Sequence, residues 1–475
     1  MKARTVEEQQ DDDLVRTMRQ KTQLELVFPP RATGEARSDA AEATEIRTAT
    51  IVPESSMMVG VTREAVVARD NLRQAPDHVR RNKGAPGIDG MTIDDLAAYL
   101  KDHWPQIRVQ LLDGSHRPQP VRRVAIPKAS GGTRALGIPT VLDRLIQQAV
   151  MQVLQVDWDG TFSETSFGFR PKHSAHQAVE RAQAYIASGY AVVVDIDLEK
   201  FFDRVNHDIL MGLVAKRIAD KRLLKLIRGF LTAGALEGGL VSPTEEGTPQ
   251  GGPLSPLLSN LMLDVLDKEL EKRGHRFVRY ADDCNIDVRS QRAGERVMAG
   301  IERFLEKRLK LKVNRAKSAV AKPSVRKFLG FSFTREPSPR RRIAPQAIAR
   351  FKAKVRELTR RTGGKSLAQI VKELSVYLIG WRGYFGFCQT PSVLRALDEW
   401  IRRRLRAIAW KQWKRGPARF AELRRRGVDR VLAAKTASSP RGPWRLGNSP
   451  ALNIALPKAF LGSLGLASIA VPRPA

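Results

Sequence analysis

Residues 277–288 read FVRYADDCNIDV, two short apolar runs separated by the adjacent aspartates Asp282 and Asp283. Every second residue from Cys284 to Val288 is apolar. This period of two predicts two strands joined by a tight turn at the aspartates. Aspartate in a turn most often caps the local backbone. The alternative is that the two carboxylates share a divalent cation, which requires a third carboxylate, a nucleotide pocket and a polyanion-binding surface elsewhere in the chain.

The composition indicates a polyanionic partner. The 475 residues include 82 Lys and Arg against 50 Asp and Glu, a net charge of +32. Such an excess reflects partners and not fold, and nucleic acid is the commonest polyanion. The charge is uneven, since residues 341–430 hold 24 basic and 6 acidic residues whereas residues 1–60 hold 8 basic and 11 acidic ones. The length suits about three domains of ~150 residues.

The cysteines and the apolar runs exclude several classes of protein. Cys284 and Cys388 are the only cysteines and form no CxxC pair, so neither a zinc knuckle nor a disulfide framework is predicted. This usage fits a reducing compartment, and we expect a cytoplasmic protein. No apolar run reaches about 18 residues, so no membrane span is expected. The N-terminus is polar and acidic, unlike a secretory signal.

The middle of the chain mixes strand and helix patterns without a repeating βαβ unit, which predicts an α+β fold. Residues 191–197, AVVVDID, read as a buried strand, and residues 253–274 read as a helix with an apolar face. Residues 1–60 are polar and poorly periodic, so we expect a flexible extension. From about residue 349 the pattern is helical and basic. The other predicted elements are a strand over 120–128, helices over 141–155 and 297–309, and a strand over 328–333.

A third carboxylate follows the buried strand. Asp197 lies where the run AVVVDID ends, and a charge at that point must be paired, hydrated or bound to metal. A salt bridge to one of the many arginines would satisfy it, but three carboxylates on neighbouring strands favour a divalent cation. The loop GTPQGGPLSP (247–256) has glycines that let a backbone approach a ligand closely. Glycine-rich turns before helices are common, so this loop is weak support alone.

Seven blocks in order, from about residue 65 to 430, make the chain resemble bacterial group II intron reverse transcriptases, which are also maturases. The blocks are RRVAIPK (122–128) with GGTRALGIPTVLDR (131–144), SETSFGFRPKHSAHQA (163–178), DLEKFFDRVNH (197–207), TPQGGPLSPLLSN (248–260), YADD (280–283), KVNRAKS (312–318) with FLGFSF (328–333), and GWRGYF (380–385).

The resemblance implies a right-hand polymerase. Its expected parts are fingers over 61–185, palm over 186–335, a basic helical thumb or maturase domain over 336–430, and a C-terminal tail over 431–475. Many relatives carry a C-terminal HNH nuclease with paired cysteines, and nothing of that kind is expected here after residue 430. The implied reaction uses two Mg²⁺ ions, with the primer 3′-hydroxyl attacking the α-phosphate of a dNTP and pyrophosphate leaving.

The resemblance also assigns the catalytic carboxylates. Asp197, Asp282 and Asp283 match them, with Asp197 and Asp282 expected as direct metal ligands and Asp283 in a secondary place. The backbone carbonyl of Leu198 is the expected third metal ligand.

Five further residues match positions that surround the incoming nucleotide. Phe202 matches the residue that packs under the sugar and excludes a 2′-hydroxyl, although the residues alone favour an ordinary core phenylalanine. Gln250 matches the residue beside the nucleotide. Lys128 and Arg134 match the fingers residues that hold the triphosphate, or else they are two solvated charges. Lys317 matches a basic palm residue near the triphosphate.

The basic C-terminal region predicts RNA contact. On a helix around residues 394–408, Arg402, Arg403 and Arg406 form a broad basic face suited to structured RNA, unless that face is only solvated. The expected function is RNA-directed DNA synthesis together with assistance to intron splicing and mobility. The expected partners are the intron RNA, an RNA template with a DNA primer, target DNA and dNTPs. The alternatives are a polymerase-inactive splicing cofactor, which the intact carboxylates disfavour, and a related enzyme recruited to defence or DNA repair.

Overall fold

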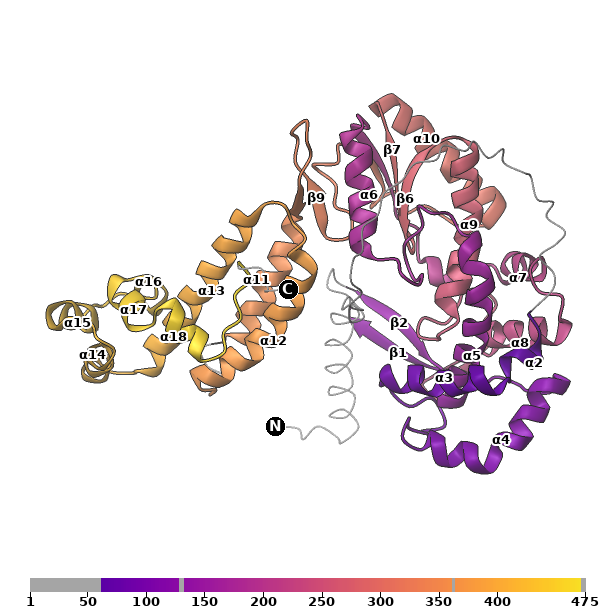
Figure 1. Ribbon diagram of the computed structural model, residues 1–475, viewed down its shortest axis with the longest axis horizontal. Helices are drawn as coiled ribbons and strands as arrows, with labels where there is room; N and C mark the ends of the chain where they lie inside the picture. Colours follow the sequence, from indigo (N-terminus) through magenta and orange to yellow (C-terminus); the bar gives the residue numbers. More distant parts are fainter. Residues whose placement is uncertain (1–60, 128–131, 361–363, 471–475) are drawn as a thin grey trace, which may run out of the picture. The chain divides into compact units, whose positions relative to one another are not determined.

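The computed structural model describes residues 61–127, 132–360 and 364–470 (Figure 1). These residues divide into two compact units, of which the first ends at Arg326 and the second begins at Lys327. The extension predicted over residues 1–60 lies outside the described residues, and so does Lys128.

The described part of the first unit contains two four-stranded sheets. One has the order β2-β1-β4-β5, in which β1 pairs antiparallel with β2 and parallel with β4. The other has the order β6-β7-β3-β8, and all of its neighbours are antiparallel. Its central strand β3 is the predicted β-branched run, a composition that suits a buried strand. The strands are β1 Val121–Pro127, β2 Thr133–Ile138, β3 Val192–Ile196, β4 Ala235–Glu237, β5 Leu240–Ser242, β6 Arg276–Tyr280, β7 Asp283–Val288 and β8 Ala319–Ala321.

Helices form where the sequence shows helical spacing. The patterns over 141–155 and 253–274 become α5 and α9, and the pattern over 297–309 covers the end of α10 and the π-helical turn η4. Thr140 caps α5, because its side chain accepts a hydrogen bond from the N–H of Asp143. The helices of this unit are α2 Arg63–Val66, α3 Arg69–Arg81, α4 Leu96–Asp113, α5 Val141–Trp158, η2 Asp159–Thr161, α6 Ala175–Ala187, η3 Phe201–Asp203, α7 His207–Ala215, α8 Lys221–Thr232, α9 Ser255–Lys272, α10 Gln291–Phe304 and η4 Leu305–Leu309.

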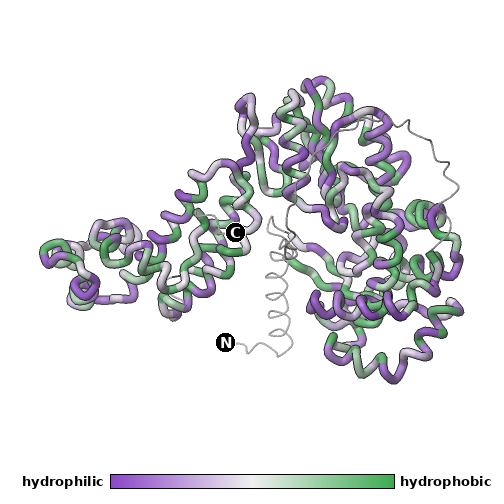
Figure 2. The backbone as a smooth tube through the Cα atoms, in the orientation of Figure 1, coloured by the Kyte–Doolittle hydropathy of each residue, from purple (hydrophilic) through white to green (hydrophobic). Residues whose placement is uncertain are grey.

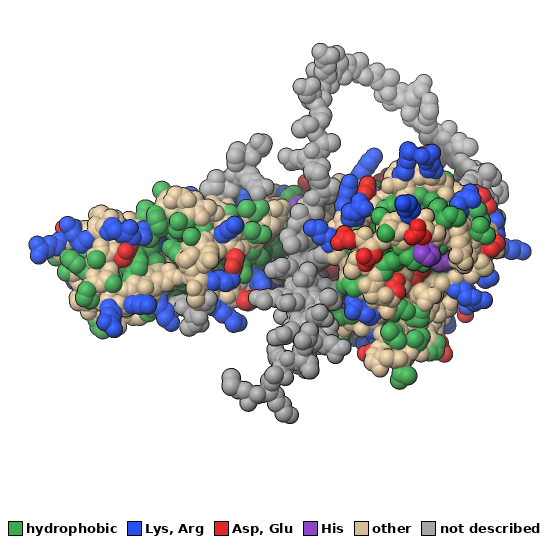
Figure 3. Space-filling view, turned by 90° about the horizontal axis from the view of Figure 1, so that it is seen from below, with side chains coloured by type: hydrophobic (Ala, Val, Ile, Leu, Met, Phe, Trp, Pro, Cys, Tyr) green, Lys and Arg blue, Asp and Glu red, His purple; other side chains and the backbone are tan. Residues whose placement is uncertain are grey.

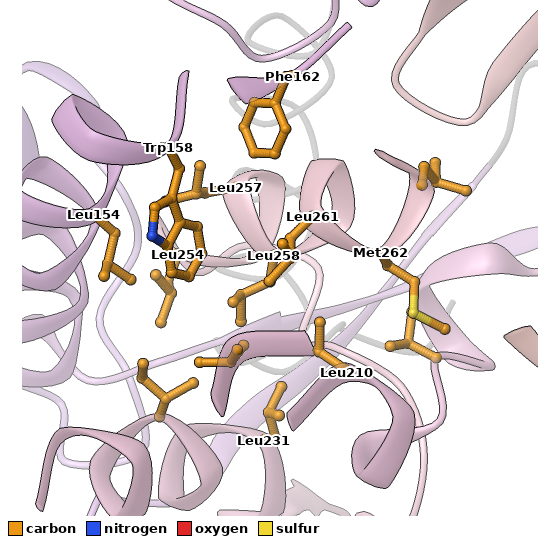
Figure 4. Packing of buried hydrophobic residues seen from close by; sticks show 14 of the residues in the cluster. Leu154, Trp158, Phe162, Leu210, Leu231, Leu254, Leu257, Leu258, Leu261 and Met262 are labelled. Carbon is orange, nitrogen blue, oxygen red and sulfur yellow. The ribbon is translucent and has the colours of Figure 1, made fainter. Parts of the chain in front are cut away.

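Apolar side chains from α5 and from the start of α9 build the core of this unit. Leu254, Leu257 and Leu258 gather around Trp158 and Leu154 (Figure 4). All five are at most 3% exposed. Fully burying one leucine contributes about 1.5–3 kcal/mol. The core therefore fixes the first turns of α9, directly after the glycine-rich loop.

Apolar and polar residues alternate along the helices of both units (Figure 2). This amphipathic pattern lets one face of each helix pack inward.

Helix α10 approaches strand β8 closely at Gly294, because a Cβ there would lie 2.4 Å from Cγ1 of Val320 on β8. Among the residues that the structure describes, no helix is long and apolar enough to cross a membrane.

The second unit begins with a two-stranded sheet and continues as helices. β9 pairs antiparallel with β10, so the strand predicted at the end of the palm belongs to this unit, ahead of the predicted boundary at residue 335. Its core is mainly aliphatic and includes a group of aromatic rings, with the ring of Trp381 centred 4.3 Å from Phe351 and 4.8 Å from Phe385. The elements are β9 Phe331–Phe333, β10 Arg341–Ile343, α11 Pro345–Leu358, α12 Leu367–Phe385, α13 Pro391–Gln412, α14 Gly416–Arg425, α15 Arg430–Ala437, α16 Pro443–Leu446, α17 Pro450–Ala455 and α18 Lys458–Ser463.

The described residues of the C-terminal tail are mostly helical and packed. Leu446, Leu452 and Leu456 are buried in one cluster with Trp410 of α13. The Ser, Pro and Gly content hid these helices, because short helices begin with proline in the first turn, as α16 and α17 do.

Candidate active site

The predicted hairpin forms, and its turn carries the first of the two adjacent aspartates. Tyr280 of β6 pairs with Asp283 of β7, so Ala281 and Asp282 make a two-residue connection. Ala281 has a φ of 56°, in the left-handed region that residues other than glycine rarely adopt. Asp282 is half-buried, whereas Asp283 is exposed and begins β7.

The strand register brings Asp197 to the same end of the sheet. Ile196, the last residue of β3, pairs with Cys284 of β7, so the next residue, Asp197, lies beside the hairpin turn. The N–H of Asp197 donates to Oγ of Ser318 at 2.9 Å, and the N–H of Asn314 donates to the carbonyl of Asp197 at 2.8 Å. These two hydrogen bonds fix the backbone of Asp197, and therefore the position from which its carboxylate extends.

Burial and charge both act on Asp282. Removal from water raises the pKa of its carboxyl above the ordinary range, and the negative charge of Asp197 raises that pKa further. Arg134 and Arg279 oppose the shift by lowering the pKa. Two carboxylates that repel each other away from bulk water favour a bound cation or a proton. Asp197, Asp282 and Arg134 are thus close enough to interact, although they are far apart in sequence.

The strand register and the electrostatics bring the carboxylates of Asp197 and Asp282 together here. Within the described residues, no group of three or more His, Cys, Asp or Glu side chains is placed to hold a metal ion. Asp197 and Asp282 are the two carboxylates predicted as direct metal ligands, and the secondary place of Asp283, the first residue of β7, stays a prediction. Asp195, the acid within β3, pairs with Arg326 at 2.5 Å.

Basic side chains lie beside this pair. Nζ of Lys317 is 3.6 Å from Oδ1 of Asp197. Arg134 is exposed on β2, opposite Ile126 of β1, and its charge acts on Asp282. A polyphosphate bound at the carboxylates would therefore meet positive charge from two segments of the chain.

The glycine-rich loop connects two other segments to the site. The N–H of Thr248 donates to the carbonyl of Phe202 at 2.7 Å, and the N–H of Gly137 donates to the carbonyl of Gln250 at 3.0 Å. A Cβ on Gly251 would lie 2.6 Å from the carbonyl oxygen of Gly137. The loop therefore joins the segment after β3 to strand β2, and it needs glycine to do so.

The two adjacent phenylalanines after β3 have different surroundings. Phe201 is a core residue, 2% exposed, whereas Phe202 is half-buried with its ring edge-on to Phe201 at 5.2 Å. Phe201 is therefore an ordinary core residue, whereas the ring of Phe202 is partly accessible. The side chain of Leu198 is buried and its backbone bridges to Val313, which places the Leu198 peptide directly beside Asp197.

The three arginines predicted to form an RNA-binding face on α13 each have a partner within the chain. Arg402 pairs with Asp398 on the same helix. Arg403 donates to the carbonyl of Trp444 at 3.1 Å and stacks on its ring at 4.1 Å. Arg406 is buried and donates to the carbonyl of Leu456 at 3.0 Å. Arg403 and Arg406 thus contact the C-terminal helices while Arg402 pairs within α13, and contact of this face with RNA stays a prediction.

Sequence reasoning missed a buried ion pair under the hairpin. Arg279 of β6 and Asp267 of α9 are both fully buried and lie 2.5 Å apart. The available signal was an arginine inside the apolar run FVRY, and an aspartate on a helix with an apolar face. A charge in either place needs a partner.

Comparison with known families identifies two regions. The family described as reverse transcriptase (RNA-dependent DNA polymerase) matches residues 126–333. The family described as group II intron, maturase-specific domain matches residues 348–427. The first match contains all the candidate residues around Asp197 and Asp282, and the second lies within the second compact unit.

Curated proteins match over parts of their length. Protein YkfC of Escherichia coli (strain K12) is 38% identical over 208 residues, covering 42% of this chain and 55% of that protein. The group II intron-encoded protein LtrA of Lactococcus lactis subsp. cremoris is 41% identical over 188 residues, covering 39% and 31%. A putative COX1/OXI3 intron 2 protein of Saccharomyces cerevisiae is 31% identical over 229 residues, covering 48% and 26%. The matches thus span about half or less of these relatives.

Proposed function

Because this chain belongs to the group II intron reverse transcriptase and maturase family, we propose that it is an RNA-directed DNA polymerase that also binds its intron RNA and assists splicing and mobility. One observation carries the polymerase proposal. Asp197 and Asp282 lie at one end of the sheet, close enough for the charge of Asp197 to raise the pKa of the half-buried Asp282.

The donor set fits a hard divalent cation. Reverse transcriptase domains generally use divalent metal ions, and carboxylate and carbonyl oxygens are the ligands that Mg²⁺ prefers. We propose that Asp197, Asp282 and the carbonyl of Leu198 hold two Mg²⁺ ions. When bound, the ions offset the repulsion between the carboxylates and supply positive charge to the attacking and leaving oxygens.

The other residues at the site bind and orient the nucleotide. Arg134 and Lys317 face the carboxylates, and their charges would hold the triphosphate of a dNTP. The half-buried ring of Phe202 would pack under the sugar, and Gln250 would lie beside it on the loop bonded to β2. Together they would place the α-phosphate at the primer 3′-hydroxyl, and orientation of this kind lowers the barrier.

The second compact unit is proposed to bind RNA. It contains the region that matches the maturase-specific family, and residues 341–430 hold 24 basic and 6 acidic residues. Its helices present Lys and Arg side chains on the face seen in Figure 3. The proposed partners are intron RNA, an RNA template with its DNA primer, and target DNA, all in the cytoplasm.

Primer extension with the Asp282→Asn variant tests the polymerase proposal. Incorporation of dNTPs should fall by at least ~10³-fold, since a metal ligand is lost, while RNA affinity stays near wild type. Asp287→Asn is the matched control on the same strand, because Asp287 is buried and not part of the pair, and it should extend normally. Near-normal extension by the Asp282 variant would overturn the assignment. A wild-type chain that binds RNA but never extends a primer would favour the splicing cofactor.

A further inference from the structure

The fully buried guanidinium of Arg279 contacts three parts of the chain around the catalytic turn. Its Nε donates to Oδ1 of Asp267 at 2.7 Å and its Nη2 donates to Oδ2 of Asp267 at 2.5 Å. Its Nη2 also donates to Oγ of Ser166 at 2.7 Å. Its Nη1 donates to Oδ1 of Asn260 at 3.1 Å and to the carbonyl of Ala281 at 2.9 Å. All five N–H donors of the guanidinium are therefore used.

The bond to Ala281 bears on the catalytic carboxylate directly. The Ala281 carbonyl belongs to the peptide bond that joins Ala281 to Asp282. The hydrogen bond to this oxygen therefore fixes the orientation of that peptide plane, and with it the direction in which the Asp282 side chain projects. Ala281 has the left-handed φ of 56°. An unfavourable backbone conformation of this kind persists only where the surrounding structure holds it.

The loop over residues 163–168 packs against the same turn and is hydrogen-bonded to Arg279 beside it. The N–H of Arg279 donates to the carbonyl of Thr165 at 2.9 Å, and the N–H of Phe167 donates to the carbonyl of Arg279 at 2.8 Å. Asn260 donates through Nδ2 to the carbonyl of Gly168 at 2.8 Å. Gly168 is so close that a Cβ there would lie 2.1 Å from the backbone nitrogen of Ala281.

We propose that Arg279 and Asp267 are positioning residues, which hold the peptide before Asp282 so that its carboxylate stays beside Asp197. Asp267, on α9, orients the guanidinium of Arg279. The guanidinium then holds the turn between β6 and β7 in place. The inference rests on the proposed polymerase function and extends it to residues that touch neither substrate nor metal. A lysine at position 279 would keep the charge but could not form this set of bonds.

A buried ion pair can also serve folding alone, and α9 offers a matched control for that alternative. Asp264 lies one helical turn before Asp267, is nearly as buried, accepts from Nη2 of Arg217 at 3.2 Å and lies 2.9 Å from Nζ of Lys268. The other side-chain bond of Arg217 is to Thr161 at 2.7 Å, and its guanidinium faces the ring of Trp158. Asp264→Asn therefore weakens ion pairs on the same helix without removing any hydrogen bond of Arg279 to Asp267 or to the turn.

The test compares Asp267→Asn, Asp264→Asn and Arg279→Lys in the full-length protein. The first readout is hydrogen–deuterium exchange of the peptide 277–288 without divalent ions, at temperatures set equally far below each Tm. Exchange at the turn should rise about 10-fold in the Asp267 and Arg279 variants and stay unchanged in the Asp264 variant. The second readout is primer extension, where kcat or the affinity for Mg²⁺ should fall about 10- to 100-fold in the same two variants, with KM for the template nearly constant.

Equal exchange and equal kinetics in the Asp267 and Asp264 variants would overturn the positioning role and leave a purely structural ion pair. Should Asp267→Asn fail to fold, Arg279→Lys carries the same comparison. Failure of the proposed function has a different signature, because the wild-type chain would then extend no primer, while the exchange experiment would still report on the turn.

Discussion

Nζ of Lys317 lies 3.6 Å from Oδ1 of Asp197, and the two side chains come from segments that the sheet brings together. Lys317 is 66% exposed, so its ammonium has the freedom to move from the carboxylate to a bound ligand. A cation that borders both the carboxylate of Asp197 and solvent suits the proposed role of a residue that meets the nucleotide as it enters.

Lys317→Ala should therefore weaken nucleotide binding more than it slows chemistry. Loss of a charge-assisted contact to the triphosphate is worth on the order of 1.5 kcal/mol, which raises KM for the dNTP about 10-fold. Steady-state primer extension over a range of dNTP concentrations measures this. Arg315→Ala is the control, because Arg315 is exposed two residues away and pairs with Glu302 at 2.7 Å. Equal KM values in wild type and the Lys317 variant would remove Lys317 from the nucleotide site.

Phe202→Ala should relax selection of the sugar. The half-buried ring of Phe202 is proposed to occupy the space that a 2′-hydroxyl would need, so its removal should raise incorporation of ribonucleotides relative to deoxyribonucleotides by about 10-fold or more. Competition between rNTP and dNTP in single-nucleotide extension provides the ratio. Phe201→Leu, in the core, should lower Tm with the ratio unchanged. An unaltered ratio in a folded Phe202 variant would assign Phe202 to packing alone.

Local patterns predicted much of the site. The period-2 alternation around Asp282 and the β-branched run before Asp197 depend on neighbours in sequence, and both became the expected strands. The pairing of Ile196 with Cys284 joins segments nearly ninety residues apart, and no local pattern specifies such a register. The sequence could thus indicate the acids but not the register that brings Asp197 beside Asp282.

The partners of the arginines on α13 could not be predicted from the sequence for the same physical reason. Helical spacing correctly places Arg402 and Arg406 on one face of α13. It does not reveal that Asp398 pairs with Arg402, or that the carbonyl of Leu456 accepts from Arg406. Burial by helices that follow later in the chain is a tertiary property.

Asp287 should make stability depend on pH. This carboxyl lies on β7, and burial raises its pKa to about 8. Its folded pKa is above the unfolded value of about 4, so its stabilising protonation is complete below pH ~4 and is lost as the pH rises through about 8. Asp287→Asn cannot ionise. Its free energy of unfolding, relative to wild type, should therefore increase from pH 5 to pH 8 by on the order of 3 kcal/mol.

Denaturant titrations of both proteins at several pH values measure this difference. Subtracting the wild-type curve cancels the contribution of all other titrating groups. A difference that stays constant from pH 5 to pH 8 would mean that Asp287 is ionised in the folded protein at neutral pH.

Charge reversal in and just after the last turn of α13 should separate RNA binding from folding. Lys411 and Lys414 are exposed there, unlike Arg406. Replacing both lysines with glutamate should weaken intron RNA binding and flatten the dependence of log Kd on log salt by about 1–2, because fewer counterions are released. The Tm of this double variant should change little.

Arg402→Glu instead places an acid beside the buried Asp398, and should lower the free energy of unfolding by on the order of 3 kcal/mol. RNA titrations across salt concentrations, with Tm for each variant, distinguish the two effects. An unchanged salt slope in the double lysine variant would show that this end of α13 does not contact RNA.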